Sequence, residues 1–545
     1  MMFLVNLWNS AEGARWPSGL ARVAILGTSA IFFAAASVAP AAAEEIDELK
    51  SEMRQLLDRI DNLEQNQQQT QIEVDQIEAN SAWLVNERPV RARATVIGPL
   101  TSQGEYVSGG DFPGSFKLPG SDSSMAIYGF IKADFIHNFG VHRSFGPQLA
   151  VPGLQPAKGA AGSGIQGQTN FRFNPSQFNI ETRTPSEYGE IRTHVQFDWF
   201  ETDFDGGPNN STVNEIRNGL RLAQASIGPW TFGQQWTAFT DLSQYAETAD
   251  WENLNSAPIC RCPALTYADS LGGGWSFAVS IVDPVTQIET DAGSFDVLTS
   301  EDSSAVNGAG VPFDTIISQN ALVSVNRGMP DIQANIKYAQ DWGHLFASAQ
   351  VRRIGYDVDF AANESAGSQF LAATGKSNDS VTGWGFTLGL NLNDPFGLHP
   401  RDRFYTNATY GEGIRGIIDN SLFCFTPLSG GGGCVLEATV DGVTGELEVN
   451  SNMGFMAHYQ HWWTDTIRST IIYGLTRNSP GADFDREGTL RRTQYAVANL
   501  WWSPLARVNL GIETQYIEAK FKSDGPNEPK ANESVQVQFS AVVLW

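Results

Sequence analysis

The chain lacks long apolar runs once its first forty residues are past, although apolar residues make up 41% of its 545 residues. A helix needs roughly 20 consecutive apolar residues to cross a bilayer, so any later membrane crossing has to be made by strands. Basic residues are also scarce, with 35 Lys and Arg against 60 Asp and Glu and a formal net charge of −25. Without a basic patch to meet a phosphate backbone, nucleic acid is excluded as a partner.

Cysteine is scarce as well, with four residues in the whole chain, at positions Cys260, Cys262, Cys424 and Cys434. In an exported protein four cysteines indicate two disulfides rather than a metal site, and three connectivities are open. We favour Cys424–Cys434 as a clip across a Gly-rich loop. The Cys260 and Cys262 pair is close in sequence, so it forms a strained bridge or bonds elsewhere.

The amino-terminus has the pattern of an export signal. Arg15 and Arg22 carry positive charge, residues 23–36 are apolar, and Ala41 to Ala43 offer a small-residue cleavage site. We therefore assign residues 1–43 to a signal peptide. An anchoring helix that stays in place is the alternative, but the apolar run is short for a membrane span.

A heptad pattern follows the export signal. Ile46, Leu49, Met53, Leu56, Ile60 and Leu63 recur at alternating spacings of three and four residues. A lone helix of this kind has no core to pack against, so self-association is expected. Residues 44–86 are predicted to form a coiled coil and residues 87–124 a linker rich in Gly, Ser and Pro. The pattern leaves a dimer and a trimer open.

The last thirteen residues, Glu533 to Trp545, alternate between apolar and polar side chains. Val535, Val537 and Phe539 fall on one face, and Gln536, Gln538 and Ser540 fall on the other. In water such a strand would expose an apolar edge to aggregation. In a transmembrane barrel it would close the wall against the first strand.

Segments of about ten alternating residues recur from Met125 to the end of the chain. About sixteen candidate strands cover residues 125–137, 177–184, 190–200, 217–227, 230–238, 262–269, 275–283, 330–340, 344–356, 381–392, 402–411, 452–463, 466–477, 491–502, 506–521 and 533–545. Short turns, such as Gly228-Pro229, Asp341–Gly343 and Ser503-Pro504, alternate with long connections, such as 138–172, 239–261 and 412–451. This alternation is typical of outer-membrane barrels. We predict an all-β, transmembrane antiparallel barrel over residues 125–545, preceded by the α-helical coiled coil.

Specific stretches of the chain resemble the DcaP-like outer-membrane porins. These stretches are Tyr128–Asp134, Glu187–Asp198, Phe232–Phe239 and Tyr410–Ile414, in a chain ordered as coiled coil, linker and barrel. The resemblance implies a trimeric porin that admits small acidic molecules, with dicarboxylates as the family's suggested substrates. It also implies a cell outer-membrane location with the coiled coil in the periplasm. The two cysteine-bearing loops depart from the family pattern, which puts its loop geometry and selectivity in doubt.

No group of residues indicates catalysis. His458 and His461 are three apart, which on a strand places them on opposite faces, and the Gly430–Gly433 run lacks the Lys of a phosphate-binding loop. We therefore expect no enzyme, no cofactor and no metal site. An outer-membrane phospholipase or protease is the alternative that the sequence leaves open.

Charged side chains on the faces opposite the apolar ones are expected to line the lumen and set selectivity. The cations are Lys132, Arg183, Arg192, Arg352, Arg403, Arg468 and Arg491, and the anions are Asp134, Glu181, Glu190, Asp198 and Glu513. The excess of cations is modest. It contrasts with the acidic chain as a whole, whose negative charge must lie mostly in outer loops and in the coiled coil.

The third long loop, which narrows the pore in sixteen-stranded porins, carries Asp241, Glu247, Asp250 and Glu252. Opposite wall arginines, these acids would create a transverse field that orients charged solutes; alternatively they only solvate an exposed loop. We expect a homotrimeric porin for small hydrophilic, anionic solutes, in contact with outer-membrane lipid and lipopolysaccharide. The alternative is a structural anchor whose coiled coil tethers the envelope, with peptidoglycan as the partner.

Overall fold

The computed structural model describes residues 109–140, 167–173, 175–201, 217–250, 256–284, 288–290, 323–325, 328–358, 371–372, 374–414, 418, 437–440, 444–479, 490–522 and 531–545. The expected signal peptide and coiled coil, together with Glu252, Cys424 and Cys434, lie outside these residues. The coiled coil and the homotrimer therefore stay predictions. Among the described residues, no helix is both long and apolar enough to cross a membrane.

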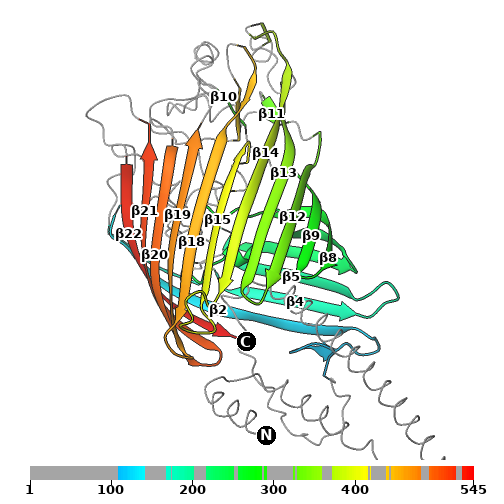
Figure 1. Ribbon diagram of the computed structural model, residues 1–545, viewed down its shortest axis with the longest axis vertical. Coiled ribbons are helices and arrows are strands. Elements are labelled where there is room, and N and C mark those ends of the chain that lie inside the picture. The colour runs from blue at the N-terminus through cyan, green and yellow to red at the C-terminus, as the bar shows by residue number, and fades with distance from the viewer. Residues whose placement is uncertain are drawn as a thin grey trace, which may run out of the picture. The chain divides into compact units, whose positions relative to one another are not determined.

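Sixteen antiparallel strands of the described chain form one closed ring (Figure 1). Each strand pairs with the next along the chain, as the alternation of short turns and long connections predicted. The strands are β2 (Ser124–Asn138), β4 (Gln177–Thr184), β5 (Ile191–Glu201), β6 (Arg217–Ile227), β7 (Trp230–Trp236), β8 (Arg261–Gly272), β9 (Trp275–Val282), β12 (Asp331–Gln340), β13 (Gly343–Val358), β14 (Asn378–Asn393), β15 (Arg403–Glu412), β18 (Ser451–Trp462), β19 (Ile467–Ser479), β20 (Leu490–Leu505), β21 (Val508–Phe521) and β22 (Ala531–Leu544). The prediction of an all-β barrel is confirmed.

The ring closes where the first long strand meets the last. β2 pairs with β22 from Phe130 opposite Leu544 to Asn138 opposite Gln536. Trp545 extends this seam, because its N–H donates to the Gly129 carbonyl at 3.0 Å. Any side chain at position 129 would strike the Gln177 carbonyl, so Gly129 lets the terminal residue and β4 approach together. Closure removes the exposed edge that the final strand would otherwise present.

The two faces of the wall have opposite character. On β22, Val535, Phe539 and Val543 are exposed on the outside, while Gln536, Gln538 and Ser540 are buried on the inside. On β2, Ile127, Ile131 and Phe135 likewise face out. An outer surface of exposed large apolar side chains is what a lipid-facing wall requires.

Six shorter strands lie outside the predicted set: β1 (Phe116–Lys117), β3 (Gln168–Arg172), β10 (Ile288–Thr290), β11 (Val323–Val325), β16 (Ala438–Val440) and β17 (Leu447–Val449). β1 folds back on β2, so the end of the expected linker belongs to the barrel. β3 extends the pairing of β2 beyond β4, inside a segment that we expected to be a loop. β10, β16 and β17 form a separate three-stranded sheet.

One predicted turn is displaced. Ser503 and Pro504 lie inside β20, and the turn falls at Ala506 and Arg507. The ladder with β21 is irregular between Trp502 and Leu505. Proline is tolerated in a strand at such an irregularity because no ladder hydrogen bond is needed from its nitrogen. Pro504 therefore marks a defect close to the turn and not the turn itself.

Candidate functional site

The described parts of the connection between β7 and β8, residues 237–250 and 256–260, contact the inner wall of the barrel, and we call them the inward loop. At its start Ala238 donates to Ser280 on β9 at 3.0 Å, and Phe239 donates to Gln333 on β12 at 3.3 Å. A short 3-10 helix, η3 (Leu242–Gln244), follows and is capped by the Asp241 side chain. The loop then crosses the inner wall as far as β22 and β2. The sequence placed the acidic residues on this loop, and the structure shows what three of them contact.

Asp241 is buried against the wall. Its carboxylate lies 2.9 Å from Nε2 of His344 on β13 and accepts the Ser243 amide at 3.1 Å. Burial opposes ionisation of Asp241, but the neighbouring His344 and the Ser243 amide prevail and hold the pKa of this carboxyl below its ordinary value. Asp241 therefore fixes the start of the loop as a paired carboxylate.

Glu247 makes the most extensive ion pair of the loop. Arg468 on β19 donates to both carboxylate oxygens, with its Nε 2.6 Å from one of them. Gln460 donates to the same carboxylate at 2.7 Å. The Arg468 guanidinium also lies 5.0 Å from the ring of Trp462, and both partners of the pair are buried. A bidentate pair of this kind combines charge with fixed geometry, so Glu247 is an anchor.

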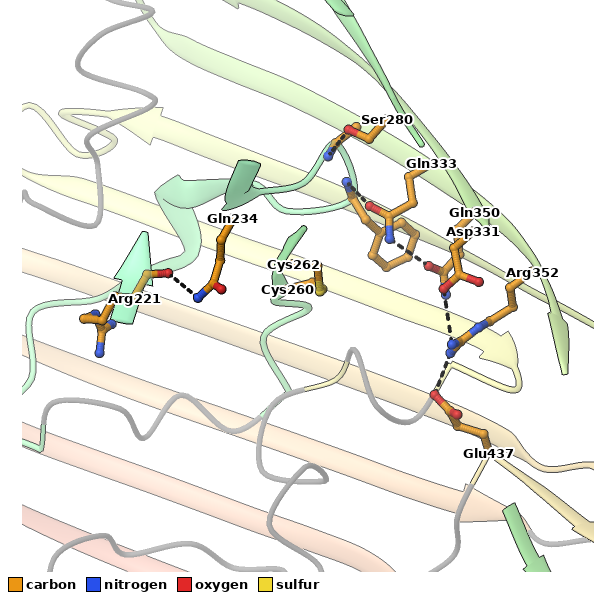
Figure 2. The surroundings of a disulfide bond; sticks show 12 residues. Arg221, Gln234, Cys260, Cys262, Ser280, Asp331, Gln333, Gln350, Arg352 and Glu437 are labelled. Atoms are coloured by element: carbon orange, nitrogen blue, oxygen red, sulfur yellow. Dashed lines mark hydrogen bonds and ion pairs between the residues drawn. A yellow bond between two sulfur atoms is a disulfide. The ribbon is translucent and has the colours of Figure 1, made fainter. Parts of the chain in front are cut away.

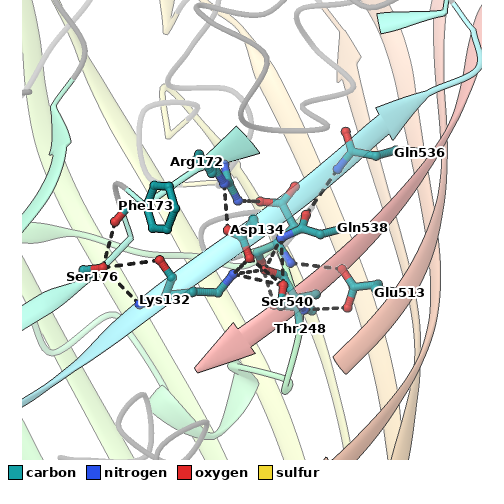
Figure 3. A network of polar contacts seen from close by, with 12 residues as sticks. Lys132, Asp134, Arg172, Phe173, Ser176, Thr248, Glu513, Gln536, Gln538 and Ser540 are labelled. Atoms are coloured by element: carbon teal, nitrogen blue, oxygen red, sulfur yellow. Dashed lines mark hydrogen bonds and ion pairs between the residues drawn. The ribbon is translucent and has the colours of Figure 1, made fainter. Parts of the chain in front are cut away.

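The tip of the inward loop docks on the closing seam (Figure 3). Glu513 on β21 accepts the backbone amides of Ala249 at 2.7 Å and Asp250 at 3.1 Å. Gln538 on β22 donates to the Ala249 carbonyl at 2.7 Å, and Lys132 on β2 donates to it at 2.8 Å. The loop tip is thus joined to the three strands that meet at the seam.

Lys132 and Asp134 form the centre of this cluster (Figure 3). Asp134 pairs with Lys132, accepts Arg172 Nε at 2.9 Å and accepts the Ser540 hydroxyl at 2.5 Å. Arg172 also reaches Asp250 at 3.5 Å. All of these side chains are buried. They lie on the inner face as expected, but they are occupied with one another and with the loop.

Arg183 and Arg192 have a different environment. They are directly opposed on the inner faces of β4 and β5, and both donate to Glu181, each Nε at 2.8 Å. Their side chains stay partly exposed, at 18% and 23%. Glu190 is 3.7 Å from Arg183 but half exposed, so water screens it. Two guanidinium groups therefore share one well-placed carboxylate, which leaves positive charge at the wall.

Arg352 lies deep in a charged group (Figure 2). It pairs with Asp331 on β12 at 3.2 Å and with Glu437, which precedes β16. It also donates to the Gly413 carbonyl at 3.1 Å. Arg352 is 1% exposed, so it fastens the long connection after β15 to the inner wall.

The remaining predicted wall cations lie at the ends of strands. Arg403 opens β15 and donates to the Pro400 and Asp402 carbonyls, at 3.2 and 2.8 Å, which holds a turn at the short-turn end. Arg491 is the extra residue where the pairing of β20 with β21 slips between Leu490 and Arg492. The structure places it near the rim of the wall.

Cys260 and Cys262 lie where the inward loop rejoins β8, with their sulfur atoms in contact (Figure 2). Their Cα atoms are 5.4 Å apart. This separation falls within the range of disulfides.

Two important wall residues are missing from the sequence prediction. Arg172 lies on β3, inside a segment without a clear alternating pattern. Arg221 occupies a slip in the pairing of β5 with β6, and it donates to Gln196 at 3.3 Å and pairs with Asp198. A bulge turns an extra side chain to the other face, so strict alternation does not find it.

Within the described ranges, no three His, Cys, Asp or Glu side chains come together in a way that could hold a metal ion. The arrangement presents a barrel with charged inner walls and an inward loop fixed by ion pairs. It can therefore filter solutes by size and charge.

The chain is similar to a known protein family and to solved structures. The model of the family described as Porin subfamily matches residues 105–413. The outer membrane channel DcaP of Acinetobacter baumannii is similar in structure, with a TM-score of 0.57, 18% identity, and coverage of 80% of this chain and 100% of that chain. An anion-selective porin from Comamonas acidovorans matches with a TM-score of 0.43, 10% identity, and coverage of 78% and 100%. No curated protein sequence matches the chain.

Proposed function

Because this chain belongs to the Porin subfamily, we propose that it is an outer-membrane channel for passive diffusion of small, anionic, hydrophilic solutes. The membership and the closed barrel support an outer-membrane porin. The anionic preference rests on the charges that remain accessible at the inner wall.

The anionic preference rests on one observation: the charged side chains of the inward loop are buried, whereas the arginines of β4 and β5 are partly exposed. Asp241, Glu247 and Asp250 are buried and paired, so their field is largely neutralised locally. Arg183 and Arg192 share Glu181 and are partly exposed. Arg183 and Arg192 therefore present two accessible guanidinium groups to a passing solute, with the half-exposed Glu190 beside Arg183.

The solute class that we propose is small dicarboxylates. Arginine offers planar, paired donors that match a carboxylate, and two opposed arginines can receive two carboxylates. Glu181 keeps the guanidinium groups in position and leaves some of their N–H groups without a hydrogen bond to another described residue. The dicarboxylate preference also follows the resemblance of the motifs to the DcaP-like porins.

Replacing both arginines, as Arg183→Gln/Arg192→Gln, should reduce the anion-to-cation permeability ratio about fivefold. A unit charge about 4 Å away in water is worth about 1 kcal/mol, which corresponds to that factor. The reversal potential of a planar bilayer in a KCl gradient measures the ratio. Succinate should also reduce the KCl conductance of the wild-type protein and have little effect on the double variant.

The matched control is Arg353→Gln, which removes an exposed arginine from β13 on the opposite face of the strand from Arg352. Its reversal potential should equal that of the wild type. An unchanged potential in the double variant would show that the arginine pair does not set selectivity. Cation selectivity of the wild type would contradict the anionic function itself.

We further propose that Cys260 and Cys262 form a disulfide that closes the base of the inward loop. The 5.4 Å separation of their Cα atoms, which lies within the range of disulfides, supports this pairing. Mass spectrometry of the unreduced peptide that contains both residues should show a mass lower by two hydrogens and no alkylation by iodoacetamide. Alkylation of either thiol before reduction would contradict the proposal.

A further inference from the structure

A row of basic side chains crosses three neighbouring strands near the end of the barrel opposite the short turns. Arg477 on β19 is directly opposite Arg492 on β20, and Arg492 is directly opposite Lys520 on β21. Directly opposed residues of a sheet point to the same face and lie about 5 Å apart. The three cations therefore form one continuous row.

This row lies on the outer face of the wall. On β19 the inward positions, such as Thr476 and Asn478, are buried, while Arg477 is exposed, as are Ile471 and Tyr473 on the same face. On β21, Ala519 and Phe521 are buried together with Leu490, so Lys520 between them points outward. The same surface that carries the apolar band thus carries the cations.

The row marks the upper limit of the apolar band. The outer-face residues four positions closer to the short turns on the same three strands are Tyr473, Ala496 and Tyr516. Still closer to the short turns, Ile471 on β19 and Ile512 on β21 are exposed. Short turns face the periplasm in outer-membrane barrels. The basic row therefore lies at the level of the headgroups of the outer leaflet, outside the cell.

The charges in this patch do not cancel among the described residues. Glu518 lies 3.0 Å from Arg492 and 3.5 Å from Lys520, and thus serves two cations. Glu533 on β22 is directly opposite Glu518, so the three cations of the row face two carboxylates. In a chain with a net charge of −25, this is a local excess of positive charge.

Like charges directly opposed across strands destabilise a sheet unless an anion lies between them. Arginine binds phosphate oxygens through paired N–H groups, and cationic side chains at a membrane surface attract anionic headgroups. We propose that Arg477, Arg492 and Lys520 form a binding site on the outer wall for the phosphate groups of lipopolysaccharide. The site holds one lipid against the barrel and has no part in solute passage.

The test uses the full-length protein, purified from outer membranes in mild detergent, and its triple variant Arg477→Gln/Arg492→Gln/Lys520→Gln. Native mass spectrometry and a lipopolysaccharide assay measure the lipid retained per chain. We expect at least a tenfold loss of retained lipopolysaccharide in the triple variant. Its single-channel conductance should equal that of the wild type, which also reports that the barrel is folded.

Arg353→Gln is the matched control, because it removes an exposed arginine of β13, outside the row, whose guanidinium donates to the Ser380 hydroxyl on β14 at 2.9 Å. It should retain lipid like the wild type. The variant Arg477→Lys/Arg492→Lys keeps the charge and loses the paired donors, so it should retain an intermediate amount. If the triple variant does not fold, the retention measured for this double variant is the test of the site.

Binding of added lipids to the delipidated protein distinguishes lipopolysaccharide phosphate from phospholipid phosphate as the ligand. Delipidated wild-type protein should bind purified lipopolysaccharide at least tenfold more tightly than its dephosphorylated form. Equal binding of the two forms, or equal retention by the triple variant, would overturn the proposal. Equal affinity for phosphatidylglycerol vesicles would assign the patch to phospholipid and would overturn it as well.

Discussion

Replacing Arg468 with methionine should destabilise the barrel by about 3–5 kcal/mol, because it leaves the buried Glu247 carboxylate without its bidentate partner. Glu247 would keep the Asn499 side chain, which donates to its backbone carbonyl at 2.6 Å, and Gln460, which donates to its carboxylate at 2.7 Å. The freed loop should fluctuate within the lumen. Urea unfolding of the refolded barrel measures the stability, and single-channel recordings should show a larger and noisier conductance.

Two controls separate this ion pair from general damage. Arg401 pairs with Asp465, whose side chain is 92% exposed, so Arg401→Gln should change stability by no more than about 1 kcal/mol. The double variant Glu247→Met/Arg468→Met removes both charges, so it should recover much of the lost stability. A single Arg468→Met variant with wild-type stability and conductance would show that the loop is held by other contacts.

Asp134→Asn should have a second large effect, of about 3–5 kcal/mol, at the closing seam. Asparagine has the same shape, but it leaves Lys132 and Arg172 buried without the carboxylate that they share. The seam between β2 and β22 should open more readily. The fraction of heat-modifiable, folded protein on a gel and the hydrogen exchange of residues 130–138 both measure this change.

Asp269→Asn is the appropriate control for the seam. Asp269 lies on β8, where it accepts the Tyr267 hydroxyl at 3.1 Å in an exposed position. Its replacement should alter stability by at most about 0.5 kcal/mol, as is usual for surface substitutions. If the seam amides of the Asp134→Asn variant are protected from hydrogen exchange as well as those of the wild type, the buried carboxylate is not needed for closure.

The strands could be predicted because a barrel wall separates two solvents. Side chains on β22 such as Phe539 and Gln538 must alternate between lipid and interior, so their pattern is visible along the chain without any knowledge of neighbours. The same rule identified Lys132, Asp134, Arg352 and Arg468 as residues of the inner face. Each of these four is buried on that face.

The rule fails where pairing slips or where a connection folds back. Arg221 and Arg491 occupy irregular positions, and β3 follows a long connection. The partners of the loop acids were not predictable either. Glu247 and Arg468 are separated by 221 residues, and only closure of the ring and folding of the loop bring them together.

The sequence by itself therefore determined the class of fold, the number and order of the main strands, and the face on which most charged residues lie. Those features depend on local alternation and on connection length. The tertiary structure decided what the charges do, because the energy of a charge depends on its neighbours in space. It made Asp241, Glu247 and Asp250 anchors of the inward loop, left Arg183 and Arg192 accessible at the wall, and aligned Arg477, Arg492 and Lys520 at the outer rim.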